Sequence, residues 1–121
     1  MKKLLTAFAL LLVFSCQKET KYQESQLLGN WDVIEWNDIT NNKKINADVS
    51  FTFEAESRYE AKYGNASEKG KYWIEVDNLH TIEDEKAEKK VKIKTLTADT
   101  LIFGMNRTGN IEELVLIKIS K

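Results

Sequence analysis

The sequence contains no proline, one cysteine, one histidine and only five glycines among its 121 residues. The missing prolines and scarce glycines exclude collagen-like chains and proline-rich low-complexity chains. A single cysteine cannot form an intramolecular disulfide, which excludes a small disulfide-stapled domain. Charged residues make up 31% of the chain and hydrophobic residues 42%, a balance that argues against wholesale disorder. The length therefore predicts one domain with a modest core.

Residue patterns of known catalytic and metal sites are also missing. His80 is the only imidazole, and it lies in the alternating segment 79–82, where we expect it to be structural. The sequence has no Gly-x-Ser-x-Gly, phosphate loop or dinucleotide fingerprint, and no His or Cys pair that could bind zinc. The acidic residues 83–85 lack the spacing of a calcium loop and are interpreted as a solvated turn. We therefore expect that the protein is not an enzyme and has no cofactor and no metal site.

The N-terminus has the pattern of an exported protein. Lys2 and Lys3 precede the apolar run Leu4–Phe14. This run is too short to span a bilayer, but it has the length of the hydrophobic region of a signal peptide. A buried N-terminal helix or strand is the alternative, but polar, charge-rich sequence begins abruptly at Gln17. We therefore expect an N-terminal signal peptide over residues 1–15.

The four residues Val13-Phe14-Ser15-Cys16 resemble the lipobox of bacterial lipoproteins. The resemblance implies cleavage before Cys16, a diacylglycerol on its thiol and, usually, acylation of the new N-terminus. Each buried CH₂ contributes roughly 0.8 kcal/mol, so one acyl chain binds marginally and two or three anchor firmly. The alternatives for Cys16 are a free thiol or a metal ligand, which no second Cys or nearby His supports. The expected partner is therefore the lipid bilayer, through the acylated Cys16.

The segment Gln17-Lys18-Glu19-Thr20 resembles the short charged signals that direct Bacteroidetes lipoproteins to the cell surface. We expect a lipid anchor in the bacterial outer membrane, and both the surface and the periplasmic face remain open. Removing residues 1–15 takes away two lysines and no acid, so 16 basic and 19 acidic residues give the mature chain a net charge of −3. The two signs are mixed along the chain, and nothing indicates a nucleic acid partner.

The mature chain is expected to consist of the lipidated cysteine with a polar tether, residues 16–26, and one domain, residues 27–121. The dominant hydrophobic period in the domain is two, which indicates β-strands. In residues 44–54 a five-step alternation includes Ile45, Ala47 and Val49. With Gly, Asn and Asp at the turns, such alternations predict eight strands. Their ranges are 30–37, 45–54, 57–63, 70–77, 79–84, 89–97, 99–105 and 110–119.

The short connections predict antiparallel pairing of sequential strands. Eight strands can close into a barrel without free edges, and a small sandwich of two sheets is the alternative. Residues 83–92 carry Glu–Lys pairs at helical spacing but almost no apolar stripe. We therefore favour a hairpin tip near residues 85–88 over a helix.

The domain opens with Leu27-Leu28-Gly29-Asn30-Trp31, and Gly-x-Trp at the head of the first strand resembles the lipocalin signature. Residues 51–53, 70–74, 93–101 and 113–118 resemble the small lipocalin-like domains of Bacteroidetes lipoproteins. The resemblance implies an all-β fold, a single antiparallel eight-stranded up-and-down barrel, after the signal peptide. It also implies a structural lid made of Gly29, Trp31 and Lys118. In this lid Gly29 turns the backbone, Trp31 crosses the closed end and Lys118 stacks on the indole. An ordinary core position for Trp31 is the alternative.

A barrel with an apolar interior can hold a small hydrophobic ligand. Because eight strands enclose a narrow bore, an interior filled with side chains remains equally open. The favoured function is a non-enzymatic binding module, and the alternative is an outer-membrane interaction or structural lipoprotein that contacts an envelope protein and has no ligand. Trp36 and Trp73 alternate onto polar faces and would serve the alternative, unless local bulges turn them inward. The expected inward-facing, ligand-binding residues are Val49, Phe51, Phe53, Tyr59, Tyr72, Ile74, Ile93, Leu101 and Phe103.

Overall fold

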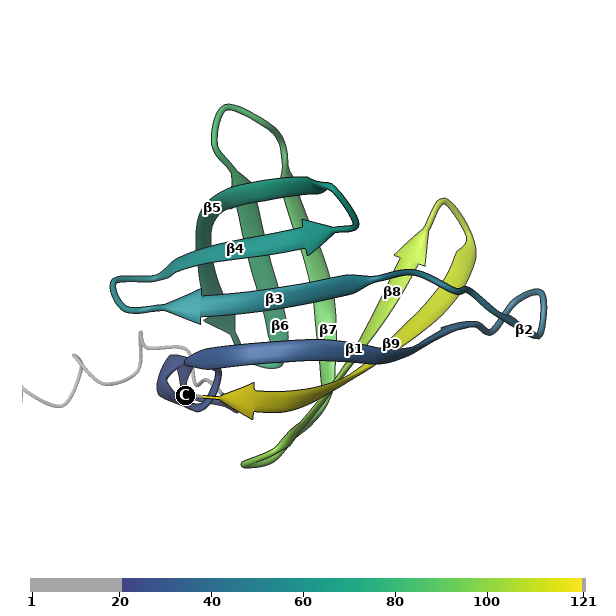
Figure 1. The fold of residues 1–121 in the computed structure, drawn as a ribbon, viewed down its shortest axis with the longest axis horizontal. Coiled ribbons are helices and arrows are strands. Elements are labelled where there is room, and N and C mark those ends of the chain that lie inside the picture. The colour runs from purple at the N-terminus through teal and green to yellow at the C-terminus, as the bar shows by residue number, and fades with distance from the viewer. Residues whose placement is uncertain (1–20, 121) are drawn as a thin grey trace, which may run out of the picture.

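The computed structural model of the protein describes residues 21–120. The predicted signal peptide, Cys16 and tether residues 17–20 lie outside the described residues. The described chain contains one 3₁₀ helix, η2 (Glu24–Gln26), and nine strands (Figure 1). The strands are β1 (Gly29–Asp38), β2 (Lys43–Lys44), β3 (Val49–Glu54), β4 (Arg58–Tyr63), β5 (Ala66–Glu75), β6 (Asn78–Glu83), β7 (Glu88–Leu96), β8 (Thr100–Arg107) and β9 (Asn110–Ser120).

The strands form one closed antiparallel barrel. Their order is β2-β1-β3-β4-β5-β6-β7-β8-β9, and pairing of β1 with β9 closes the sheet. The two-residue β2 pairs only with Asn37 and Asp38 of β1, so it is an appendage to an eight-stranded barrel. This confirms the predicted up-and-down barrel and excludes the two-sheet sandwich.

Several predicted strand limits were wrong. β3 begins at Val49, not at residue 45, although the alternation of residues 45–48 is regular. In the structure Ile45 is half-buried and Ala47 is exposed. Residues 45–48 connect β2 to β3 outside any strand, and only the backbone N–H of Ile45 bonds to β1, at the carbonyl of Trp36. Alternation therefore marked a half-buried face but could not show whether a neighbouring strand was present. β5 begins at Ala66, four residues before the predicted start at residue 70, because the preceding turn needs only residues 64–65.

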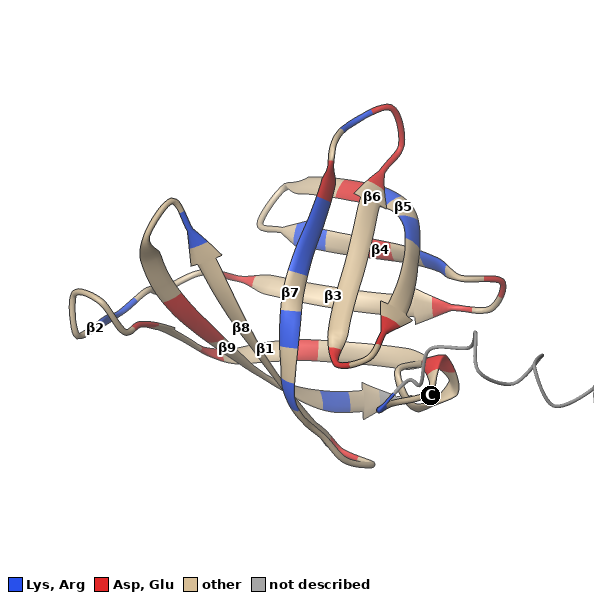
Figure 2. Ribbon diagram, turned by 180° about the vertical axis from the view of Figure 1, so that it is seen from behind, with Lys and Arg blue, Asp and Glu red and all other residues tan. Residues whose placement is uncertain are grey.

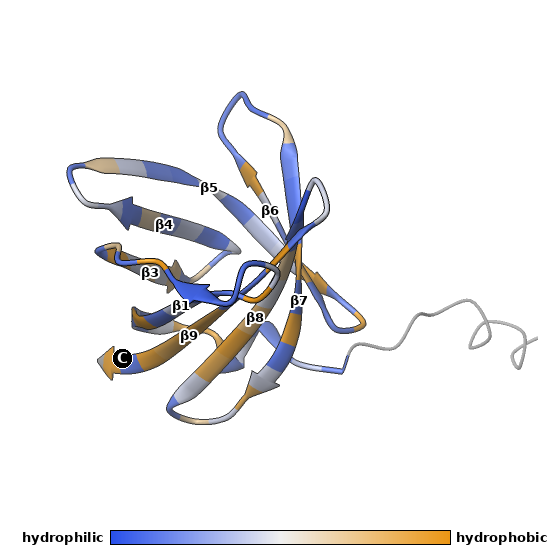
Figure 3. Ribbon diagram, turned by 90° about the vertical axis from the view of Figure 1, so that its right-hand side faces the viewer, coloured by the Kyte–Doolittle hydropathy of each residue, from blue (hydrophilic) through white to orange (hydrophobic). Residues whose placement is uncertain are grey.

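The connection between β6 and β7 is a hairpin with its tip at residues 84–87. This confirms the predicted hairpin in place of a helix. Figure 2 shows the same hairpin with acidic residues at its tip and the lysines of β7 along the strand. The most continuously hydrophobic strands are β8 and β9 (Figure 3).

Residues 21–26, expected to belong to the tether, pack on the barrel. The backbone N–H of Lys21 donates to the carbonyl of Val76 at 2.8 Å, and Tyr22 packs against the core. Ser57 Oγ donates to the carboxylate of Glu24 at 2.8 Å. The last six residues of the predicted tether therefore lie against the barrel.

Candidate binding pocket in the open half of the barrel

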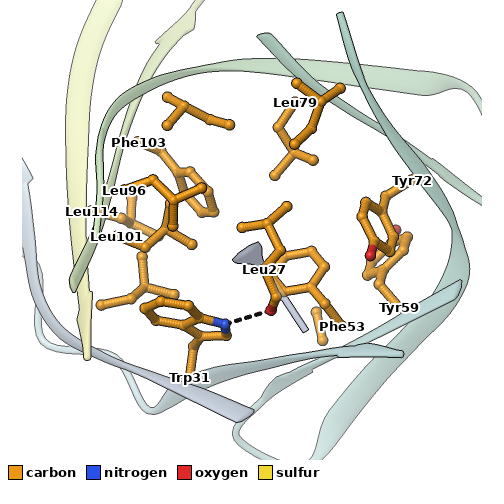
Figure 4. Close-up of a cluster of buried hydrophobic side chains, with 14 residues drawn as sticks. Leu27, Trp31, Phe53, Tyr59, Tyr72, Leu79, Leu96, Leu101, Phe103 and Leu114 are labelled. Atoms are coloured by element: carbon orange, nitrogen blue, oxygen red, sulfur yellow. Dashed lines mark hydrogen bonds between the residues drawn. The ribbon is translucent and has the colours of Figure 1, made fainter. Parts of the chain in front are cut away.

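One end of the barrel is closed by packed side chains. Trp31 and Leu27 are completely buried there, and Trp31 Nε1 donates to the carbonyl of Leu27 at 2.8 Å (Figure 4). Lys118 faces Trp31 across the β1–β9 ladder, and its Nζ lies 5.0 Å from the centroid of the indole. Gly29 has a φ of 127°, a conformation that residues with a Cβ rarely adopt. The three predicted lid residues thus meet at this closed end, beside η2.

The opposite half of the barrel contains a pocket of about 420 Å³. This volume lies within the range of roughly 300–1,000 Å³ that is typical of sites for small ligands. Most of the wall is apolar, and the polar groups are few. The lining residues are Trp36, Phe51, Tyr63, Glu68, Leu79, Thr81, Lys89, Val91, Phe103, Met105, Arg107 and Leu114.

The predicted inward-facing residues divide between the two halves of the barrel. All nine are buried or half-buried. Only Phe51 and Phe103 line the pocket, where their rings meet edge to face with centroids 5.8 Å apart. The other seven do not line the pocket, and all but Val49 belong to one buried hydrophobic cluster. Those seven are Val49, Phe53, Tyr59, Tyr72, Ile74, Ile93 and Leu101.

Most residues of the pocket wall were not among the ligand-binding residues predicted from the sequence. Val91, Leu79 and Leu114 extend the same period-two pattern as the predicted residues, so the continued alternation was the available signal. Trp36 was not predictable in this way. A register shift between Val33 and Glu35 in the β1–β9 ladder changes the phase of β1 and turns Trp36 into the barrel.

Trp73 lies half-buried and outside the pocket wall. Its ring stacks on His80, with centroids 5.0 Å apart and an angle of 6° between the ring planes. Nδ1 of His80 lies 2.6 Å from a carboxylate oxygen of Glu88. The stack and the carboxylate hold the imidazole against the barrel, away from the pocket.

Glu68 of the pocket wall has two partners, Tyr59 from the buried cluster and Lys89 from the pocket wall. Tyr59 donates its hydroxyl proton to Glu68 at 2.5 Å, and Lys89 Nζ lies 3.4 Å from the other oxygen of Glu68. Burial, together with the nearby Glu68 carboxylate, raises the pKa of Tyr63 to about 12 and also raises the pKa of Tyr59. Both phenols are therefore protonated at neutral pH, and Tyr59 is a hydrogen-bond donor to the carboxylate.

Residues 21–120 contain no cluster of three or more His, Cys, Asp or Glu that could hold a metal ion. No helix in the same range is long and apolar enough to cross a membrane.

Comparisons with known proteins agree with this geometry. The family described as "Lipocalin-like domain" matches residues 27–103 of the chain. A lipocalin-like protein from Bacteroides uniformis has a similar structure, with a TM-score of 0.61 and 14% identity, over 78% of this chain and 99% of that one. An uncharacterised protein from Bacteroides eggerthii gives a TM-score of 0.64 at 15% identity, over 77% of this chain and 99% of that one.

A third structure, solved by NMR and also from Bacteroides uniformis, gives a TM-score of 0.61 at 23% identity, over 82% of this chain and 94% of that one. At these identities the likeness shows the fold alone. No curated protein matches the chain.

Proposed function

Since the chain belongs to the family of lipocalin-like domains, we propose that it is a membrane-anchored, non-enzymatic binding module that holds a small hydrophobic molecule. The observation that carries the proposal is the apolar pocket of about 420 Å³ in the open half of the barrel. A barrel that served only as a scaffold would gain stability by filling this space, because unfilled apolar volume lowers the free energy of unfolding. The packed closed end shows that the chain can fill its interior where no space is needed.

The binding proposal is tested with the neutral apolar dye N-phenylnaphthylamine, whose fluorescence rises in apolar surroundings. The variant Val91→Phe puts a larger side chain into the pocket wall, and phenylalanine suits a strand. Val115→Phe is the matched control, because Val115 alternates with the buried Leu114 and Leu116 and so faces outward on β9.

The wild type and the Val115→Phe control are expected to bind the dye, whereas Val91→Phe binds it several-fold more weakly. Equal binding by all three proteins would place the dye outside the pocket. Absence of binding by the wild type, with no lipid copurifying from the protein's own host, would contradict the proposal and favour an interaction or structural lipoprotein without a ligand.

Anchoring through Cys16 is the second part of the proposal. It is supported by the lipobox-like residues 13–16 and by the start of the barrel contacts at Lys21. The chain from Cys16 to Lys21 reaches at most about 3.6 Å per residue, so an acylated Cys16 would hold the barrel close to the membrane. The proposed outer-membrane location, on either face, is supported by the resemblance of residues 17–20 to the signals of Bacteroidetes surface lipoproteins.

Metabolic labelling with radioactive palmitate in a bacterial host tests the anchor. The wild type and Ser15→Ala, which keeps a small residue before the cysteine, are expected to take up label and to sediment with membranes. Cys16→Ser is expected to lose both the label and the membrane association. Labelling of Cys16→Ser equal to that of the wild type would contradict anchoring at this residue.

A further inference from the structure

The barrel wall parts between β7 and β8 in its open half. The two strands pair only from Lys92 opposite Gly104 toward the closed end. Beyond that point residues 88–91 pair with β6 alone, and residues 105–107 pair with β9 alone. The β8–β9 hairpin diverges from β7 in Figures 1 and 2. The pocket is lined by Val91 on one side of this parting and Met105 on the other.

One basic side chain lies on each side of the parting. Lys89 and Arg107 lie two residues from Val91 and Met105, in phase with the inward-facing residues of their strands, and both line the pocket. Continuing the register from Lys92 and Gly104 sets the two residues opposite each other. Their side chains are 59% and 62% exposed, so their charged ends reach the water at the opening.

The carboxylates that pair with these two basic groups, Glu68 of the pocket wall and Glu112, are in contrast buried and hydrogen-bonded to the protein. Glu68, 10% exposed, accepts the hydroxyl proton of Tyr59. Glu112, 2% exposed, accepts hydrogen bonds from Trp36 Nε1 at 2.9 Å and from Asn110 Nδ2 at 2.8 Å. A molecule entering between the strands therefore meets the two exposed basic side chains before it meets the buried carboxylates of Glu68 and Glu112.

The ion pairs of the two basic groups leave much of their donor capacity available. Lys89 Nζ lies 3.4 Å from Glu68, and a guanidinium nitrogen of Arg107 lies 3.4 Å from Glu112. These separations are longer than the roughly 2.7–2.9 Å of a strong charge-assisted hydrogen bond. An ammonium carries three N–H donors and a guanidinium five, so each group can bind a further oxygen atom.

Resting on the proposed function, we propose that the ligand is an anionic amphiphile whose apolar body fills the pocket. Its anionic group lies in the parting between β7 and β8, where Lys89 and Arg107 bind it. The apolar walls supply affinity for the body, and the two basic side chains select the charge and orient the molecule. The ligand thus enters through the side of the barrel, with its charged end outermost.

The test compares three probes that share one alkyl chain, namely dodecanoate, dodecanol and dodecylammonium. Each probe displaces N-phenylnaphthylamine from the intact protein at neutral pH, below the concentration at which the probe forms micelles. Dodecanoate is expected to bind about tenfold more tightly than dodecanol, a ratio that corresponds to about 1.4 kcal/mol. Dodecylammonium is expected to bind no more tightly than dodecanol.

Lys89→Gln and Arg107→Gln are each expected to remove most of the preference for dodecanoate over dodecanol. Binding of dodecanol also shows that each variant keeps its pocket, which separates a loss of charge from a loss of fold. Lys92→Gln is the matched control, because Lys92 is exposed on the same strand, does not line the pocket and pairs with Asp77 on the outer surface. This control is expected to keep the wild-type preference.

The outcomes separate the two proposals. If dodecanol binds the wild type as tightly as dodecanoate, or if both glutamine variants keep the preference, the anionic amphiphile is refuted while the binding function stands. If no probe displaces the dye and the dye itself does not bind, the proposed function fails.

Discussion

A buried hydrogen bond joins Trp31 to Leu27 at the closed end of the barrel, and the variant Trp31→Phe tests its contribution. The substitution keeps an aromatic ring at a completely buried position but removes the Nε1 donor, which lies 2.8 Å from the carbonyl of Leu27. A buried acceptor that loses its donor costs about 1–3 kcal/mol. The smaller ring also leaves empty volume and loses part of the contact with Lys118, whose Nζ lies 5.0 Å from the indole centroid.

The expected loss is therefore at least about 1–3 kcal/mol, out of a total stability of about 5–15 kcal/mol for an ordinary domain. For a domain of this size each kcal/mol corresponds to roughly 4–8 °C in Tm. Urea unfolding followed by far-ultraviolet circular dichroism measures the loss without relying on tryptophan fluorescence. Because Trp31 does not line the pocket, the folded variant should bind N-phenylnaphthylamine like the wild type.

Trp73→Phe is the matched control, because it makes the same chemical change at a half-buried residue of the outer wall. The substituted phenylalanine keeps an aromatic ring beside His80. Its free energy of unfolding should change by only about 0.5 kcal/mol. The reasoning is refuted if Trp31→Phe unfolds at the wild-type urea midpoint with an unchanged slope, or if the control loses as much stability as Trp31→Phe.

Two further predictions follow from the packing. Gly70→Ala should lower stability by about 1–3 kcal/mol in urea unfolding, because its Cβ would lie 2.0 Å from the backbone oxygen of Ile82. Gly104→Ala meets only the flexible side chain of Lys94, at 3.1 Å, and should unfold closer to the wild-type midpoint; the reverse order would contradict this packing. The free energy of unfolding should also fall as the pH rises from about 10 toward 12. Burial raises the folded-state pKa values of three tyrosines above the unfolded value of about 10. The unfolded chain therefore loses these protons first. Urea midpoints that stay constant over this range would contradict the shifts, which concern Tyr59, Tyr63 and Tyr72.

The sequence predicted the closed barrel and the inward face of most strands. Period-two alternation is a local property, and it holds wherever a strand has one buried face and one wet face. Phe53, Tyr72 and Leu101 therefore point inward as expected. Gly-x-Trp placed Trp31 at the head of the first strand, and the antiparallel order of the first and last strands brought Lys118 beside it.

The features that form the pocket depend on pairing between distant segments. Trp36 faces inward only because β1 shifts register against β9 between Val33 and Glu35. The parting of β7 from β8 begins where the ladder stops at Lys92 and Gly104, and neither strand changes its own alternation at that point. A pattern within one strand contains no information about where its partner leaves, so the sequence could not show where the barrel opens.

The most direct test of the account is methyl NMR spectroscopy of the barrel during titration with dodecanoate. The methyl resonances of four pocket residues are expected to change their chemical shifts, namely those of Leu79, Val91, Met105 and Leu114. The methyl resonances of the packed closed end are expected to keep their chemical shifts, namely those of Leu27, Leu101 and Leu116. An internal binding site would be contradicted if the pocket resonances do not change, or if the changes are confined to the exposed outer residues Ile117 and Ile119.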